Sequence, residues 1–211
     1  MEAIDASLPA ADGVAWFNKL YLAVTRAVHG KLAETTFADP RFLARLDVVF
    51  ANLYFRALDA GKDAPRAWAP LVQCRRRKGI APIQFALAGM NAHINYDLPA
   101  ALVQTCRELD VDLFRARRQR RDYETVNTIL ERSEAKVKRW FATDFVGVVD
   151  VALGNVDDRI AMWKVTRARD AAWANAQTLS ALGSPVLRRR YLETLDRTVG
   201  FAGRGLLVPL Q

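Results

Sequence analysis

Cysteine and histidine are scarce in this chain, whose 211 residues include two of each. The two cysteines, Cys74 and Cys106, stand in neither a redox spacing nor a metal-ligand spacing. A disulfide framework is therefore not expected, and a reducing compartment fits. With two histidines in total, the three-histidine metal sites of many hydrolases are excluded.

Long apolar runs are missing as well. No stretch approaches the roughly 20 residues that a membrane-spanning helix needs. The content of hydrophobic residues, 51%, and of charged residues, 26%, is ordinary for a globular protein. The first residues, Met1 to Ser7, are acidic and polar and lack the basic start and apolar core of a secretory signal. We therefore expect a cytoplasmic protein with no membrane span.

Sustained alternation of polar and apolar residues, which indicates half-buried strands, is almost absent. Apolar residues instead recur at spacings of three and four in nearly every segment, and helix starts are indicated at Asp39-Pro40 and at Pro82. No repeat and no linker composition is visible. The sequence predicts an all-α fold, a single-domain bundle of about seven to nine helices over residues 13–211. Residues 1–12 are predicted to form a flexible lead-in.

Capping residues predict several helix boundaries. His29 followed by glycine predicts the end of the first long helix, and Asp122 is a plausible N-cap of a helix that follows it. Residues 145–153 favour a short buried helix, and residues 160–182 favour a long one. The apolar tail from 206 to 210 is expected to dock on the body of the protein.

Acidic residues are outnumbered: 23 Asp and Glu stand against 31 Lys and Arg, which gives a net charge of +8 and a pI near 9.9. The excess is concentrated in residues 75–78, 115–121 and 188–190. These clusters have no interleaved aromatic residues and no nucleic-acid motif. We expect solvated helix ends and no specific nucleic-acid binding, with an acidic partner or substrate as the alternative.

One apolar stretch, residues 86–99, carries four polar side chains: Asn91, His93, Asn95 and Asp97. On a helix, His93 and Asp97 lie on one face, one turn apart. A buried polar group without a partner costs about 1–3 kcal/mol. The pair therefore either belongs to a satisfied structural network or serves a functional site.

Two further residues bear on this stretch. Pro99 disfavours helical geometry at the residue before it, which predicts a helix end or kink near Asp97 and a local gap. Asp47 lies in an apolar helical segment, on the same face as Tyr54. Asp47 is either a structural hydrogen-bond partner or an acid that points into the same cavity as His93.

An imidazole with a carboxylate in reach suits proton transfer near neutral pH. We expect a small-molecule enzyme that uses His93, Asp97 and Asp47 in acid–base chemistry: a cyclisation, an isomerisation or a hydrolysis. The residues expected to bind the substrate or a developing oxyanion are Asn91, Asn95, Tyr54 and Tyr96.

Two alternatives stay open. One is a metal-dependent hydrolase or oxidase with His93 and Asp97 as ligands, although the leading expectation needs no cofactor. The other is a non-catalytic helical protein that binds an apolar or anionic partner. Phosphate-binding loops, nucleophile elbows and zinc-protease signatures are absent, so the reaction class and the oligomeric state are not indicated.

Three segments together resemble an uncharacterised bacterial family, a domain of unknown function. They are residues 46–52 (LDVVFAN), 86–99 and 122–127 (DYETVN), and the phrase NAHINYDLP is the most specific part. The resemblance covers most of the chain. It implies a shared helical architecture and suggests that Asn91, His93, Asn95 and Asp97 belong together.

Overall fold

The computed structural model describes residues 1–32, 36–144 and 165–209, and within these ranges every regular element is helical. This confirms the predicted all-α fold. None of the helices in these ranges combines the length and apolar character needed to cross a bilayer. The elements are α1 (Glu2–Ser7), α2 (Gly13–Leu32), α3 (Pro40–Asp59), η1 (Gly61–Asp63), α4 (Ala69–Cys74), α5 (Pro82–Ala92), η2 (His93–Asp97), α6 (Leu98–Glu108), α7 (Arg117–Asp144), α9 (Val165–Ala181) and α10 (Pro185–Leu206).

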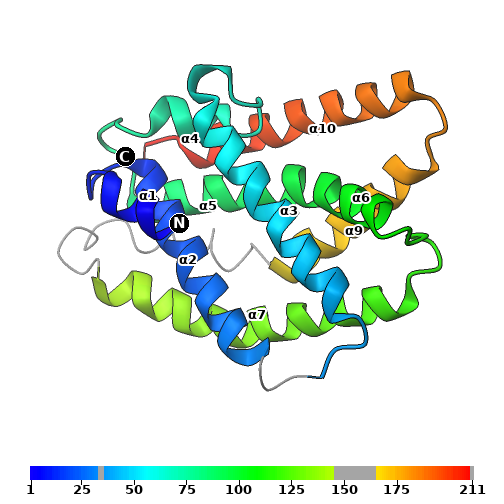
Figure 1. Cartoon of the computed structure of the whole chain (residues 1–211). Helices are drawn as coiled ribbons and strands as arrows, with labels where there is room; N and C mark the ends of the chain where they lie inside the picture. Colours follow the sequence, from blue (N-terminus) through cyan, green and yellow to red (C-terminus); the bar gives the residue numbers. More distant parts are fainter. Residues whose placement is uncertain (33–35, 145–164, 210–211) are drawn as a thin grey trace.

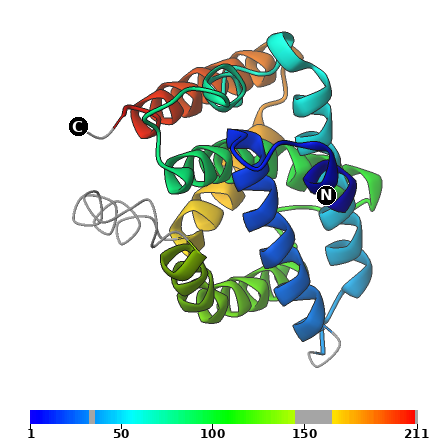
Figure 2. The ribbon, with the colours of Figure 1, turned by 90° about the vertical axis from the view of Figure 1, so that its left-hand side faces the viewer.

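A central rod organises these elements. It consists of α5, η2 and α6, which follow one another without an intervening loop. Helices α2 and α10 pack on α5, whereas α3 and α9 pack on α6. Helix α7 contacts α2 and α9, and it lies on the opposite side of the rod from α10 (Figure 1, Figure 2). The middle of the rod, η2, touches α3, α9 and α10.

Pro99, the second residue of α6, explains why η2 is a π-helical turn. A proline has no amide hydrogen, and its ring crowds the carbonyl four residues earlier, which belongs to Asn95. The N–H of Leu98 donates to the carbonyl of His93, five residues back, and this is π-type bonding. The sequence predicted a helix end or kink near Asp97; the helix instead widens for one turn and continues as α6.

The two larger of three apolar clusters in the described residues meet at η2; the third is a small one around Leu20 and Ala86. One of the larger two lies among α3, α6 and α9, around Leu98 and Trp173. The other lies among α2, α4 and α5, around Phe17 and Trp68. His93 is in ring contact with members of both clusters. The polar centre of the rod therefore stands where the two parts of the core join.

The N-terminal segment differs from the predicted lead-in. Residues Glu2–Ser7 form α1, which packs on α2. Asn18 of α2 donates from Nδ2 to the carbonyl of Met1 at 3.0 Å. The short helix had no sequence signal because its position depends on this contact with α2.

Two carboxylates show how local capping signals succeed and fail. The Asp39 side chain accepts a hydrogen bond from the N–H of Phe42, so Asp39 is the N-cap of α3, as predicted. The prediction that Asp122 is an N-cap is wrong, because α7 already begins at Arg117. The Asp122 carboxylate instead accepts from the N–H groups of Ala38 and Asp39, at 2.9 and 2.6 Å. It satisfies the chain that leads into α3.

The remaining predictions concern one helix end, two later helices and the C-terminal tail. The first long helix, predicted to end at His29, continues through Gly30 to Leu32 as α2. The predicted segment 145–153 lies outside the described residues, as does the start of the predicted helix 160–182, which is described from Val165 as α9. The C-terminal tail docks on the body: Nε2 of Gln84 donates to the carbonyls of Leu206 and Val208, at 2.8 and 2.7 Å.

Gly89 sets how closely α5 approaches α2. A β-carbon at Gly89 would lie 2.3 Å from Cγ of Phe17, whereas one at Gly205 in α10 would have no neighbour within 4 Å. We expect Gly89→Ala to lower the free energy of unfolding by about 1–3 kcal/mol through overpacking. We expect Gly205→Ala to raise it by up to about 1 kcal/mol through helix propensity. Urea unfolding measures both; a Gly89→Ala protein as stable as the wild type would contradict the close packing of α2 on α5.

Candidate functional site

The π turn η2 places His93 and Asp97 against each other. Nδ1 of His93 and Oδ2 of Asp97 are joined by a hydrogen bond of 2.9 Å. The indole N–H of Trp68, the residue before α4, donates to the same carboxylate oxygen at 3.0 Å. All three residues are buried. We call this set the His93–Asp97–Trp68 network.

Five aromatic rings enclose the imidazole of His93. Phe50 of α3 stacks on it, with 3.5 Å between the ring centroids and 5° between the planes. Tyr21 of α2 meets it edge-on at 4.7 Å. The centroids of the other three rings lie 5.9 to 6.0 Å away. We call these five residues the aromatic cage: Phe17, Tyr21, Phe50, Tyr54 and Trp68.

Nε2 of His93 is the atom of the network that has no partner. It is buried, and no described residue hydrogen-bonds to it. A buried polar atom without a partner costs about 1–3 kcal/mol. Such atoms are infrequent in protein interiors and call for an explanation, of which a chemical role is one.

Burial acts on both ionisable members of the network. It lowers the pKa of His93 well below the ordinary value of 6.5, against the opposing effect of Asp47. It raises the pKa of Asp97 well above the ordinary value of 3.8, against the opposing effect of the Trp68 hydrogen bond. Charge is therefore disfavoured on both groups, and the imidazole is neutral at physiological pH.

Asp47 lies on α3 at the solvent-exposed edge of the site. Desolvation by the surrounding protein still raises the pKa of its carboxyl, while His93 and His29 oppose that rise. Among the described residues, no hydrogen bond joins Asp47 to His93. Tyr54 is fully buried in the cage, and its hydroxyl donates to Oδ1 of Asn18 at 3.2 Å. The structure thus places the Tyr54 ring beside His93 and leaves Asp47 at the rim.

The two asparagines of the stretch belong to another side of the rod. Nδ2 of Asn91 donates to the carbonyl of Val199 in α10 at 2.9 Å. Nδ2 of Asn95 donates to Oδ1 of Asn91 at 3.1 Å. The four polar side chains therefore form two pairs with i, i+4 spacing: one is enclosed by rings from α2 and α3, and the other is bonded to α10.

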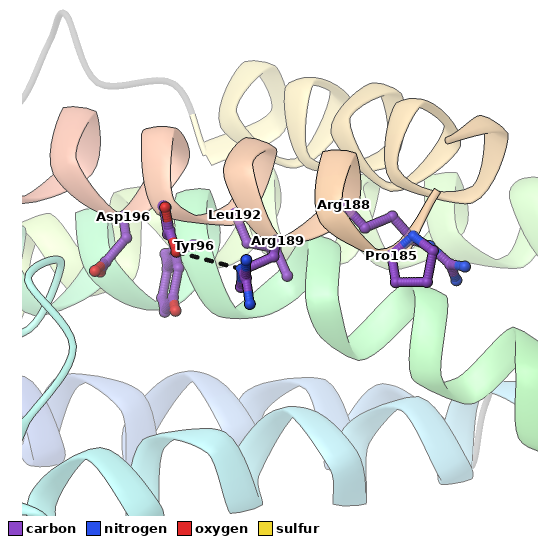
Figure 3. Close-up of a pocket in the computed structure, with 7 residues that line it drawn as sticks. Tyr96, Pro185, Arg188, Arg189, Leu192 and Asp196 are labelled. Atoms are coloured by element: carbon purple, nitrogen blue, oxygen red, sulfur yellow. Dashed lines mark ion pairs between the residues drawn. The ribbon is translucent and has the colours of Figure 1, made fainter. Parts of the chain in front are cut away.

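Tyr96 of η2 forms one wall of an open groove along α10 (Figure 3). The pKa of Tyr96 is raised to about 12, first by burial and then by Asp196 and Asp97, so its hydroxyl stays protonated. The groove has a volume of about 520 Å³ and is lined by Tyr96, Pro185, Arg188, Arg189, Leu192, Glu193 and Asp196. The same π turn therefore contributes to the buried network and to a surface groove.

Within the described ranges, no group of three or more His, Cys, Asp or Glu side chains is arranged to share a metal ion. A metal at His93 and Asp97 would therefore find no third ligand among the His, Cys, Asp and Glu side chains of these residues. The atoms that face each other, Nδ1 and Oδ2, already form a hydrogen bond. The geometry is that of an oriented imidazole.

Sequence reasoning missed Trp68, Phe50 and Tyr21 as parts of the site. Each has a sequence signal, because each is an apolar position in a helical stripe. That signal identifies core residues but does not say which of them meets a histidine on another helix. The partner of the Trp68 N–H, in particular, depends on how α4 lies against η2.

A family model covers almost the whole chain. The model of DUF5995, described as a family of unknown function, matches residues 1–209. The chain belongs to this family. No curated protein and no solved structure matches it. Membership in DUF5995 confirms the resemblance to an uncharacterised family and brings no activity with it, so the function has to be argued from the site.

A double-mutant cycle can measure the hydrogen bond between Trp68 and Asp97. We expect Trp68→Phe combined with Asp97→Ala to show a coupling energy of about 1–3 kcal/mol in urea unfolding, because either change leaves the other buried group without its partner. Trp173→Phe is the control, since Trp173 is a buried tryptophan that donates no hydrogen bond to Asp97. Equal coupling energies for the two tryptophans would contradict the proposed role of the indole N–H.

An NMR titration can test whether the His93 imidazole is neutral. The unfolded chain takes up a proton on this residue near pH 6.5, while the folded protein resists it. His93 therefore contributes stability that is present above about pH 6.5 and is lost as the pH falls below it. The raised pKa of Asp97 changes the stability with pH in the opposite direction. The protonation of the His93 ring is therefore a better measure than the pH dependence of the free energy of unfolding. We expect the His93 imidazole resonances, assigned with His29→Gln, to stay in the unprotonated position at about pH 5.5, whereas a midpoint at or above 6.5 would refute this.

Proposed function

We propose that this protein is an enzyme for a small molecule and that His93 transfers a proton through Nε2. The observation that carries the proposal is the asymmetry of the imidazole: Nδ1 is bonded to Asp97, whereas Nε2 is buried and meets no partner in the part of the chain that the structure describes. Trp68 in turn holds Asp97. In histidine–carboxylate pairs that move protons, the carboxylate fixes the orientation of the ring and the other nitrogen meets the reacting group.

The chemistry of the pair supports proton transfer without a cofactor. The step uses the state of the pair in which Asp97 is ionised and Nδ1 carries the hydrogen: Nε2 of the neutral imidazole accepts a proton, and the carboxylate stabilises the resulting imidazolium. The reverse step returns the proton to the product. The lowered pKa of His93 makes the ring a weaker base but keeps it in the form that can accept a proton. The step is sufficient for proton abstraction and isomerisation, and it can also drive a cyclisation or a hydrolysis.

The aromatic cage supports a small, flat and largely apolar substrate. Phe50 lies over the imidazole at the distance of a stacked ring, so a planar substrate can take its place. Phe50 and Tyr21 are only partly buried, and their centroids are 6.2 Å apart. They come from α3 and α2, which lie side by side (Figure 1, Figure 2). We place the entrance between these helices, where rotation of the two rings exposes Nε2.

In this proposal Asp47 is a second acid–base group at the entrance. It lies three residues before Phe50 on α3, so the two side chains share a side of the helix. A carboxyl whose pKa is raised exchanges protons closer to neutral pH. Tyr54 contributes its ring to the cage. Asn91 and Asn95 hold η2 against α10 and have no role in binding the substrate.

The test combines a ligand screen with matched histidine variants. Small aromatic compounds with ester, lactone, ketone or enol groups are screened by ligand-observed NMR, in D2O so that exchange of carbon-bound protons is visible. We expect His93→Gln and Asp97→Asn to lower the rate of conversion by at least about a hundredfold. His29→Gln is the control, because His29 is exposed and lies outside the network. Because His29 also lowers the pKa of Asp47, its replacement can change the rate slightly, but far less than a hundredfold.

Stability separates a site from a structural network. Because Nε2 already lacks a partner, we expect His93→Gln to change the free energy of unfolding by less than about 1 kcal/mol. A loss of about 2–4 kcal/mol in both variants, with no compound that binds or reacts, would remove the proposal and leave a structural network. Binding without conversion would favour a non-catalytic protein. Conversion only after addition of a transition metal would favour the metal-dependent alternative.

A further inference from the structure

The groove along α10 is separate from the His93–Asp97–Trp68 network. The α10 residues that line it run from Pro185 to Asp196 at spacings of mostly three and four, so they form one face of the helix. Tyr96 of η2 also lines the groove, near Asp196 (Figure 3). A volume of about 520 Å³ lies within the usual range of small-molecule pockets, about 300–1,000 Å³. The groove can therefore hold a ligand with a single ring.

The charged groups of the groove separate along the helix axis. Asp196 lies at the Tyr96 end and Arg188 at the other end (Figure 3). The eight positions from 188 to 196 correspond to about 12 Å along α10. Oδ1 of Asp196 is occupied, because it accepts the N–H of Ala67 at 2.8 Å. This hydrogen bond favours the ionised form of Asp196, so the Tyr96 end of the groove is negative.

Glu193, the other carboxylate of the groove, is shared by two arginines. Arg189 lies 3.9 Å from it and Arg197 lies 3.8 Å from it. The Arg189 contact is drawn as a dashed line in Figure 3. Both distances are long for ion pairs, and all three side chains are well exposed, so Arg189 keeps much of its capacity to bind another anion.

Of the two arginines in the groove, Arg188 is the one that lacks a counter-ion among the described residues. It forms no ion pair with any described residue, and its Nε is buried without a partner. Nη2 makes a long contact of 3.4 Å with the Gly183 carbonyl. Arg188 also stands near the start of α10, where the helix dipole is positive, where no acidic residue occupies the first turn, and where the Ser184 side chain makes no cap. A cation is unfavourable at this position, and a bound anion would stabilise it.

We propose that the α10 groove binds a small organic anion. A carboxylate or phosphate-ester group of the ligand accepts hydrogen bonds from Arg188 and Arg189, which are the donors that suit planar and phosphate oxyanions. An apolar ring of the ligand lies over Leu192 and against Tyr96. Glu193 and Asp196 at the far end disfavour a second negative charge there. The site does not depend on the chemistry of His93.

The test uses phenyl phosphate and benzoate as probes, titrated by calorimetry into the full chain. Benzylamine, which has the same ring and the opposite charge, is the control for apolar binding, and inorganic phosphate is the control for a bare anion. We expect saturable one-to-one binding of both aryl anions at millimolar concentrations, weaker binding of inorganic phosphate and none of benzylamine. Absence of saturable binding by both aryl anions, or equal binding of benzylamine, would overturn the proposal.

A neighbouring arginine supplies the matched variant. Arg190 is exposed and does not line the groove, so Arg190→Gln removes the same charge from the same helix. We expect Arg188→Gln to weaken binding of phenyl phosphate by at least about tenfold, through loss of a charge-assisted contact. Arg190→Gln should weaken it by less than about twofold at physiological salt. Equal losses would show general attraction to a basic protein and would refute a built site. His93→Gln should bind as the wild type does, so this proposal and the enzyme proposal can fail separately.

Discussion

Pro99 cannot donate a backbone hydrogen bond, and the arrangement of the rod around η2 depends on that missing N–H. The carbonyl bonding shifts to the five-residue spacing of a π turn between His93 and Leu98. In this wider turn His93 and Asp97 come to lie directly one above the other. The same turn directs Tyr96 to α10. A single backbone constraint thus sorts polar side chains into a buried network on one side and a groove wall on the other.

The buried network is held by segments that are distant in sequence. Trp68 supplies a donor from the start of α4, and Phe50 and Tyr21 cover the imidazole from α3 and α2. Neutral His93 and unpartnered Nε2 are both unfavourable compared with an apolar filling of the same space. The two large clusters on either side of η2 supply the stability that offsets this cost. Functional sites commonly break local rules of this kind while the surrounding fold compensates.

The features that could be predicted from the sequence are those that depend on interactions between residues close together in the chain. The start of α3 at Asp39-Pro40, the start of α5 at Pro82 and the i, i+4 contact of His93 with Asp97 are decided within a few residues, and the structure contains all three. Other features depend on which elements meet in space. Asp122 bonds the chain before α3, and Trp68 bonds Asp97; no local pattern indicates either contact. The same holds for the separation of Asn91 and Asn95 from His93, because helical spacing alone does not say which neighbouring helix each face will meet.

The number of residues in the π turn also decides how α6 is rotated relative to α5. Each residue added to a helix rotates everything beyond it by about 100°. The buried face of α6, which includes Leu98, Leu102 and Thr105, meets α3 and α9 only because η2 has the length it has. Removing one residue between positions 93 and 97 would turn that face away from its neighbours unless the π turn tightened to an α-helical one, which the missing N–H of Pro99 disfavours. The rotation of α6 relative to α5 therefore depends on the number of residues in η2. Packing alone limits insertions and deletions in this segment, even where no ligand is bound.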